Sequence, residues 1–260
     1  MVFFKRRTPA SRECRLPAGE RVYAVGDIHG RLDLLEAMLD LISADGASRP
    51  YSRTTLIFLG DLVDRGPDSR GVVARVRHLC EAGCARLIKG NHEEVFVEAA
   101  RGSRHAANAL VRIGGMPTIL SYGISEAEAR EGSFADLARL LQRRVPPEDV
   151  DFLDRSESSI VLGDYVFVHA GLRPKLALQD QNPRDLRWIR ESFTESDHNH
   201  GHFVIHGHSI SPTIEERRNR IGLDTGAFAS GRLSAMGIEG ADSWFLQAEG
   251  AVDDTAGVWD

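Results

Sequence analysis

The chain has 260 residues, of which 42% are hydrophobic and 27% are charged, and this composition suits one compact globular domain or one domain with a sizeable insert. A formal net charge of −6 argues against a protein that mainly coats nucleic acid or an anionic membrane, because both tasks need a positive field. Three cysteines make an odd number without a paired framework, which favours a reduced, cytoplasmic setting, and no apolar run approaches the length of a membrane span.

From residue 21 to residue 98, short β-rich runs alternate with amphipathic helical runs, which is typical of a βαβαβ unit. Strands are expected at 22–25, 54–59 and 85–88, and helices around 35–42, over 69–80 and from about His92. Parallel strands joined by right-handed crossovers bring their carboxyl ends to one edge of the sheet. Ligands collect at that edge, so the residues that follow these strands are the first candidates for function.

Residues 101–158 break this rhythm and predict a helical insert with a kink at Pro146 and Pro147. Beyond the insert, 160–168 is interpreted as one buried strand. Further strands are expected at 203–205, 220–223, 233–238 and 244–248, in a largely antiparallel meander that forms a second sheet. The predicted organisation is an N-terminal extension at 1–20, one domain at 21–248 and an acidic, frayed tail at 249–260.

Metal-competent residues close each of the first three predicted strands. The three clusters are Gly26-Asp27-Ile28-His29-Gly30, Gly60-Asp61-Leu62-Val63-Asp64-Arg65-Gly66 and Gly90-Asn91-His92-Glu93. Asp, His and Asn offer oxygen and imidazole donors suited to Mn, Fe or Zn, and the glycines let the backbone turn sharply so that neighbouring side chains converge. Two later strand ends add His169 and His208. Five loops are therefore expected to meet at one metal-binding edge.

These residues also have purely structural explanations. Asp and Asn often cap helices at strand-to-helix junctions, but capping does not call for histidine, which occurs in two of the first three loops. A single histidine that ends an apolar strand, such as His169, is usually a satisfied core residue, and only the ensemble of motifs favours a functional role. The histidine-rich run 197–202 is interpreted as solvated surface, and His206 stays an alternative to His208.

The ordered motifs GDIHG, GDLVDRG and GNHE, followed by HAGL at 169–172 and GH at 207–208, resemble the phosphoprotein phosphatase family within the calcineurin-like metallophosphoesterases. The likeness spans residues 21–236, and any one motif alone would be only suggestive. It implies an α/β fold with two packed mixed β-sheets flanked by helices. Within this family, the likeness is to bacterial, lambda-phosphatase-like serine/threonine phosphatases. The segment 114–123 and the ending at 224–228 resemble bacterial members and not the eukaryotic catalytic subunits, which makes a protein substrate less favoured.

The resemblance also implies the residues of a site for two divalent metal ions. Manganese is expected, with iron and zinc as alternatives. Asp27 and His29 would bind the first ion, Asp61 would bridge both, and Asn91, His169 and His208 would complete the second. His92 would act as the general acid, held by Asp64. The substrate phosphate would be bound by Arg65, Asn91 and Arg190, and Arg187 is a competitor for the last of these roles.

We therefore expect a dinuclear phosphomonoesterase, first of all a protein serine/threonine phosphatase in which a metal-bridging hydroxide attacks phosphorus in line. The alternative is a hydrolase of dinucleoside polyphosphates or of another nucleotide. A third hypothesis, an inactive module that binds phosphorylated partners, would be favoured if His92 or Arg65 were missing, and both are present. The expected partner is a phosphorylated protein or a small phosphoester, without nucleic acid or membrane, and the oligomeric state stays open.

Overall fold

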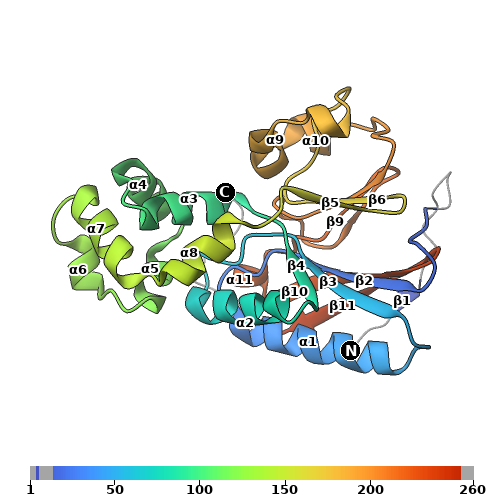
Figure 1. Cartoon of the computed structure of the whole chain (residues 1–260), viewed down its shortest axis with the longest axis horizontal. Helices are drawn as coiled ribbons and strands as arrows, with labels where there is room; N and C mark the ends of the chain where they lie inside the picture. The colour runs from blue at the N-terminus through green and yellow to red at the C-terminus, as the bar shows by residue number, and fades with distance from the viewer. Residues whose placement is uncertain (1–3, 6–13, 253–260) are drawn as a thin grey trace.

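The computed structural model describes residues 4–5 and 14–252. In it, two β-sheets pack face to face. Helices α1 and α2 cover the outer face of the first sheet, α9 and α10 cover the second, and the remaining long helices extend to one side (Figure 1). The predicted architecture of two mixed sheets with flanking helices is confirmed. In the described part of the chain, no helix has both the length and the apolar character needed to cross a membrane.

The first sheet contains the predicted parallel strands. Its order is β1-β11-β10-β2-β3-β4, and β2 (Glu20–Val25), β3 (Arg53–Phe58) and β4 (Ala85–Leu87) run parallel. The crossovers are α1 (Leu32–Ala47) and α2 (Ser69–Glu81), and α3 (Asn91–Ala100) follows β4. The βαβαβ interpretation is therefore confirmed: the three strands and α2 agree with the expected bounds within two residues at each end, whereas α1 is longer than expected.

Two late strands belong to the first sheet and not to the second, which corrects the sequence-based expectation. Strand β10 (Arg232–Glu239) pairs antiparallel with β2 and with β11 (Asp242–Glu249), and β11 in turn pairs with β1 (Phe4–Lys5). Strand β10 is buried on both faces, because helices cover one face and the second sheet covers the other. A strand buried on both faces carries no alternation that would indicate its sheet.

The second sheet has the order β5-β6-β7-β9-β8, and its centre is parallel, so the expected antiparallel meander is wrong. The strands are β5 (Ser159–Leu162), β6 (Tyr165–Val168), β7 (Phe203–His206), β8 (Glu215–Glu216) and β9 (Arg220–Gly222). The long connection from β6 to β7 carries η1 (Leu178–Asp180), α9 (Pro183–Trp188) and α10 (Glu191–Thr194), and such a crossover is what a parallel pair requires.

The expected single strand at 160–168 is also wrong, because β5 and β6 form a tight hairpin. Gly163 occupies the turn with a φ of +57°, and a Cβ there would lie 2.2 Å from the backbone oxygen of Arg15. Glycine is the residue that accepts both the left-handed conformation and the close approach.

Apolar side chains form a core on each side of both sheets. One cluster, which includes Val25, Leu35 and Phe58, lies between the first sheet and its helices. A second, with Val22, Ile57 and Phe167, fills the space between the two sheets, and a third packs α9 and α10 on the outer face of the second sheet. Burial on both faces holds the strand ends rigidly, which a site built from several loops requires.

Helices fill the segment between β4 and β5. After α3 come α4 (Arg104–Arg112), α5 (Met116–Ser121), α6 (Glu126–Arg130), α7 (Phe134–Arg144) and α8 (Pro147–Asp154). The chain breaks rather than kinks at the two prolines, because α7 ends at Arg144 and α8 starts at Pro147. Leu110, Ile119 and Leu141 from these helices belong to the same apolar cluster as the first sheet. The last part of the predicted tail, 253–260, lies outside the described residues.

Candidate active site

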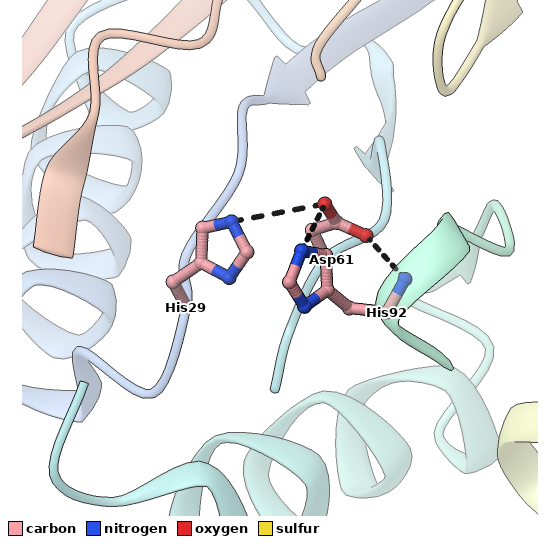
Figure 2. Close-up of side chains that lie close together, drawn as sticks. All are labelled: His29, Asp61 and His92. Atoms are coloured by element: carbon pink, nitrogen blue, oxygen red, sulfur yellow. Dashed lines mark hydrogen bonds and ion pairs between the residues drawn. The ribbon is translucent and has the colours of Figure 1, made fainter. Parts of the chain in front are cut away.

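Loops from both sheets meet at one edge and bring together most of the side chains predicted for the site. Figure 2 shows His29, Asp61 and His92 pointing toward one another from the loops after β2 and β3 and from the start of α3. All three are buried, as are His169, after β6, and His208, after β7. The strand-end rule thus places five chain segments around one buried cluster.

The backbone at this edge is held in conformations that side chains rarely adopt. Apart from Lys175, every non-glycine residue with a positive φ in the described part of the chain lies in these loops, and they are His29, Asp61, Asp64, Arg65 and His208. Such conformations cost free energy and persist only where the surroundings hold them. Backbone bonds between neighbouring loops do so here: His29 N donates to the Asp61 carbonyl at 2.9 Å, and Gly30 N donates to the Leu62 carbonyl at 2.8 Å.

Glu93 fastens two of these loops to each other. Its carboxylate accepts hydrogen bonds from the backbone N–H groups of Asp61 and Leu62, both at 2.7 Å, and of Gly90 at 2.9 Å. Burial, and then the charge of Asp61, raise the pKa of Glu93 to about 7, while the three backbone donors oppose the shift. Glu93 is the last residue of the GNHE motif, yet its side chain binds backbone N–H groups. Residue type alone does not reveal this role.

Two glycines allow the acidic side chains to approach the neighbouring loops. A Cβ at Gly90 would lie 2.1 Å from Asp61 Oδ1, and a Cβ at Gly207 would lie 2.0 Å from Asp27 Oδ1. No side chain fits at these distances, so the glycines of GNHE and GH are required by close packing.

The donor atoms form two groups that share Asp61. One contains His29, Asp61 and His92, and the other contains Asp61, His169 and His208, with ligand atoms within 4.8 Å of one another in each. Asp61 Oδ2 lies 3.7 Å from His29 Nε2, whereas Asp61 Oδ1 lies 3.4 Å from His169 Nε2. Asn91 Oδ1 lies 2.9 Å from the same His169 nitrogen. One carboxylate thus presents its two oxygens to two neighbouring positions, as two-metal sites require.

The protonation chemistry of the cluster fits divalent cations. Burial lowers the pKa of His29, His169 and His208, which keeps the imidazoles in the neutral form that binds metals. Asp27 Oδ1 and His208 Nε2 are buried and have no hydrogen-bond partner, and such groups are costly unless something binds them. Burial, and next the charge of Asp224, raise the pKa of Asp27 well above its usual range, a cost that a bound cation would offset.

The sequence model of one protein family, the calcineurin-like phosphoesterases, matches residues 20–226, and this stretch contains all of these loops. The chain belongs to this family. It is a metal-dependent phosphoesterase, a hydrolase acting on phosphoric esters.

Relatives of this metallophosphoesterase carry more than one activity in their names. The asymmetrical bis(5'-nucleosyl)-tetraphosphatase PrpE of Oceanobacillus iheyensis is 24% identical, over 83% of this chain and 87% of that protein. The serine/threonine-protein phosphatase 2 of Escherichia coli is 26% identical, over 84% of this chain and 93% of that protein. A symmetrical bis(5'-nucleosyl)-tetraphosphatase of Ralstonia nicotianae is 40% identical, but over only 32% of this chain and 26% of that protein.

Solved structures share the fold of this metallophosphoesterase. One, provisionally named a diadenosine tetraphosphatase, superposes with a TM-score of 0.62 at 24% identity and covers 92% of this chain and 100% of its own. A protein serine/threonine phosphatase from Saccharomyces cerevisiae gives a TM-score of 0.56 at 15% identity, over 91% of this chain and 82% of its own. These likenesses concern the fold and do not decide the substrate.

Arg65 faces the donor group of the metallophosphoesterase that contains His92. His92 Nδ1 contacts Asp64 Oδ2 at 2.7 Å, and His92 Nε2 lies 3.4 Å from an Arg65 terminal nitrogen. Burial lowers the pKa of His92, but Asp61 and the hydrogen bond to Asp64 raise it more, so the net shift is upward. The other Arg65 terminal nitrogen lies 3.2 Å from His29 Nε2, and the guanidinium stacks over Phe228 at 4.7 Å from the ring centre. Both terminal nitrogens of Arg65 therefore point at the cluster.

A cavity of about 530 Å³ opens over this cluster. Among its lining residues are three arginines, Arg65, Arg112 and Arg190, and the exposed Trp188. Arg187, the competitor of Arg190, instead forms an ion pair with Glu94 at 2.8 Å. A second cavity, of about 870 Å³, adjoins the first and shares Arg65, Pro117 and Phe228 with it.

The structure places the two alternative histidines in different surroundings, and likewise the two alternative arginines. His208 joins Asp61 and His169, whereas the His206 ring packs against Phe193 with 5.1 Å between ring centres and places Nδ1 3.0 Å from the Gly207 carbonyl oxygen. The structure therefore brings His208 and Arg190 to the cavity edge, and keeps His206 and Arg187 in structural contacts.

Sequence reasoning missed several residues of this site. Arg112 and Trp188 line the cavity. The Thr118 hydroxyl donates a hydrogen bond to Asp64, and Asp224 is buried near enough to Asp27 to shift the pKa of Asp27. Arg112 and Thr118 lie in the insert, outside every metal-type motif. Thr118 belongs to the segment 114–123 that resembles bacterial members, but nothing in that segment indicates a contact with Asp64. Asp224 was visible as an acidic residue after a predicted strand, which is the signal that found the other carboxylates.

The role of Glu93 in joining the loops can be tested by Glu93→Gln in chelator-treated protein. An amide turns a donor toward backbone N–H groups that need an acceptor, so we expect the free energy of unfolding to fall by about 1–3 kcal/mol. Glu98→Gln, at an exposed position of the same helix, is the matched control. Denaturant titration measures both, and equal stability of the two variants would contradict the role assigned to Glu93.

Proposed function

We propose that this metallophosphoesterase belongs to the phosphoprotein-phosphatase type and hydrolyses dinucleoside polyphosphates, with diadenosine tetraphosphate as the reference substrate. The observation that carries the proposal is the group of three arginines around one cavity beside an exposed tryptophan. Arg65 and Arg190 already suffice for a single phosphomonoester, whereas a chain of phosphates gives the guanidinium of Arg112 a partner as well.

Asp27, His29 and Asp61 would hold one divalent ion, and Asp61, Asn91, His169 and His208 the other. The bound ions would supply a polarised phosphoryl oxygen and a water of lowered pKa. Carboxylate, amide and imidazole donors accept manganese, iron and zinc, and our proposal remains manganese.

His92 is proposed to donate the proton to the leaving oxygen. Its Nδ1 is engaged by Asp64, so Nε2, which points toward Asp61 and the cavity, is the nitrogen available for proton transfer. The upward shift of its pKa favours the protonated form that a general acid needs. The carboxylate of Asp64 also fixes the ring orientation.

Arg65 is proposed to bind the phosphoryl group that is transferred, with Asn91 and Arg190 as further phosphate ligands. The two terminal nitrogens of Arg65 face His29 and His92 of the same donor group, and stacking on Phe228 limits the motion of the guanidinium. A planar guanidinium in this position can bind two phosphoryl oxygens and stabilise the charge of the in-line transition state.

Arg112 and Trp188 are proposed to bind the remainder of the substrate. Neither residue is among the proposed metal ligands or the ligands of the transferred phosphoryl group, and both line the cavity from outside the five motif loops. Glu94 accepts a hydrogen bond from the Trp188 indole at 2.8 Å, which fixes the ring at the cavity wall. An indole in such a position suits stacking on a nucleobase.

A protein serine/threonine phosphatase is the second candidate. It is supported by the likeness to the Escherichia coli serine/threonine-protein phosphatase 2 over most of both chains. Hydrolysis of phosphopeptides faster than hydrolysis of diadenosine tetraphosphate would favour it. Bound metal without turnover of any phosphoester would instead support a module that only binds phosphorylated partners.

The proposed roles of Asp61 and His92 predict different failures in two variants. We expect His92→Asn to keep its metal content and to lower kcat for phenyl phosphate by about 10²- to 10⁴-fold, the usual contribution of a general acid. Asp61→Asn weakens the one carboxylate shared by both donor groups, so we expect it to lose bound metal together with activity. Plasma mass spectrometry of the metal and steady-state kinetics separate the two cases. Turnover like that of the wild type in both variants would refute the assignments.

The role of Arg112 predicts a substrate-dependent effect of Arg112→Gln. We expect KM for diadenosine tetraphosphate to rise about fivefold, because an exposed charge contributes up to about 1 kcal/mol. The kinetics of p-nitrophenyl phosphate should not change, since that substrate has no second phosphate. Arg104→Gln, at the exposed start of the same helix, is the control. An equal effect on both substrates would argue against a polyphosphate site.

A further inference from the structure

The turn between α4 and α5, together with the start of α5, contacts the backbone that carries two proposed active-site residues. Asp64 N donates to Thr118 Oγ1 at 2.8 Å, and Arg65 N donates to the Gly114 carbonyl at 2.8 Å. Asp64 and Arg65 are consecutive left-handed residues, with φ of +73° and +69°. Because that conformation is unfavourable for both, their position depends on the groups that bind them.

Thr118 is fully buried, and its hydroxyl has no capacity left for another partner. The hydroxyl donates to Asp64 Oδ1 at 2.7 Å and accepts from Asp64 N, and it lies 2.8 Å from Ser69 Oγ. A hydroxyl has one proton and two lone pairs, so with its proton on Asp64 it must accept from Ser69. The other oxygen of Asp64, Oδ2, contacts His92 Nδ1 at 2.7 Å. Thr118 therefore fixes one carboxylate oxygen while the other orients the histidine.

Gly114 supports the second residue of the pair. Its φ of +96° lies in the region that favours glycine, and a Cβ there would lie 3.1 Å from Arg65 Cγ. The carbonyl of Gly114 can approach Arg65 N because no side chain separates the two segments.

We propose that Thr118 is a positioning residue for proton donation: its hydroxyl fixes the Asp64 carboxylate and, through it, the His92 ring. The inference rests on the proposed function, specifically on His92 as the general acid. Through Thr118, the helical insert would help to orient the proton donor, in addition to any contact that the insert makes with substrate. Loss of this positioning should slow substrates with poor leaving groups selectively. A misaligned general acid harms the departure of a poor leaving group more than that of a good one.

The experiment compares p-nitrophenyl phosphate, whose leaving group departs readily, with phenyl phosphate, whose leaving group needs a proton. The full chain loaded with manganese is used, and metal content is measured for every variant. Thr118→Val keeps the shape of the side chain and removes the hydroxyl. We expect its kcat for phenyl phosphate to fall at least roughly tenfold while kcat for p-nitrophenyl phosphate falls less than about threefold, since small displacements of a catalytic group cost this much.

Two further variants separate the hydroxyl from general packing. Thr118→Ser retains the hydroxyl and should restore the ratio of the two rates to that of the wild type. Ser121→Ala removes a hydroxyl from the same helix that binds the Thr118 carbonyl and the Arg70 N–H but not Asp64, and should leave the ratio unchanged. If Thr118→Val does not fold, Ser69→Ala removes the other hydroxyl at Asp64 N and should shift the ratio in the same direction by a smaller factor.

His92→Asn distinguishes failure of this inference from failure of the proposed function. If His92→Asn lowers both rates equally, His92 is not the general acid and the proposed mechanism is wrong. If His92→Asn is selective for phenyl phosphate but Thr118→Val lowers both rates equally or neither, the role of Thr118 is overturned. In the double variant we expect no additional selective loss, because both changes remove the same interaction. If the selective losses of kcat for phenyl phosphate add in the double variant, the role of Thr118 is also overturned.

Discussion

The carboxylate of Asp61 is the contact on which the rest of the site depends. Its two oxygens face the two donor groups, and Oδ1 also accepts a hydrogen bond from the His92 backbone N–H at 3.1 Å. Its carbonyl accepts from the N–H groups of Ile28 and His29, while its own N–H is bound by Glu93. The loops after β2 and β3 and the start of α3 are therefore joined through one residue. Moving Asp61 would displace both donor groups together.

Strained backbone conformations and buried polar groups are concentrated around the proposed metal ligands. The non-glycine left-handed residues other than Lys175, the buried carboxylates of Asp27 and Asp61, and the unpartnered Nε2 of His208 lie at the same sheet edge. Each costs free energy in isolation. The cores on both faces of the sheets hold the loops against relaxation, and bound cations would offset the buried charge of Asp27 and Asp61. Stability supplied by the scaffold and by metal thus allows a site that would not persist alone.

The local part of this structure could be predicted from the sequence. Asp27, His29, Asp61 and His92 follow predicted strands or open a predicted helix, and the geometry of parallel strands brings such positions to one edge without further information. Strand partners could not be predicted in the same way. β10 is apolar on both faces whichever sheet it joins, and the parallel pairing of β6 with β7 depends on a crossover whose course the local pattern does not specify.

The insert is the clearest case of information that a local pattern lacks. Thr118 contacts Asp64 across 54 positions of the chain, and neither residue carries a signal of the other. Arg112 and Thr118 nevertheless lie on either side of one short turn, the first exposed at the cavity and the second buried against Asp64. An exposed arginine can be exchanged with little effect on packing, whereas a buried hydroxyl with every bond satisfied cannot. A segment built in this way can change its substrate contacts while keeping the geometry of the proposed proton donor. Because Gly114 sits between the two and its carbonyl accepts from Arg65 N, a shift of the whole turn would displace both the proposed substrate contact of Arg112 and the proposed phosphate ligand Arg65.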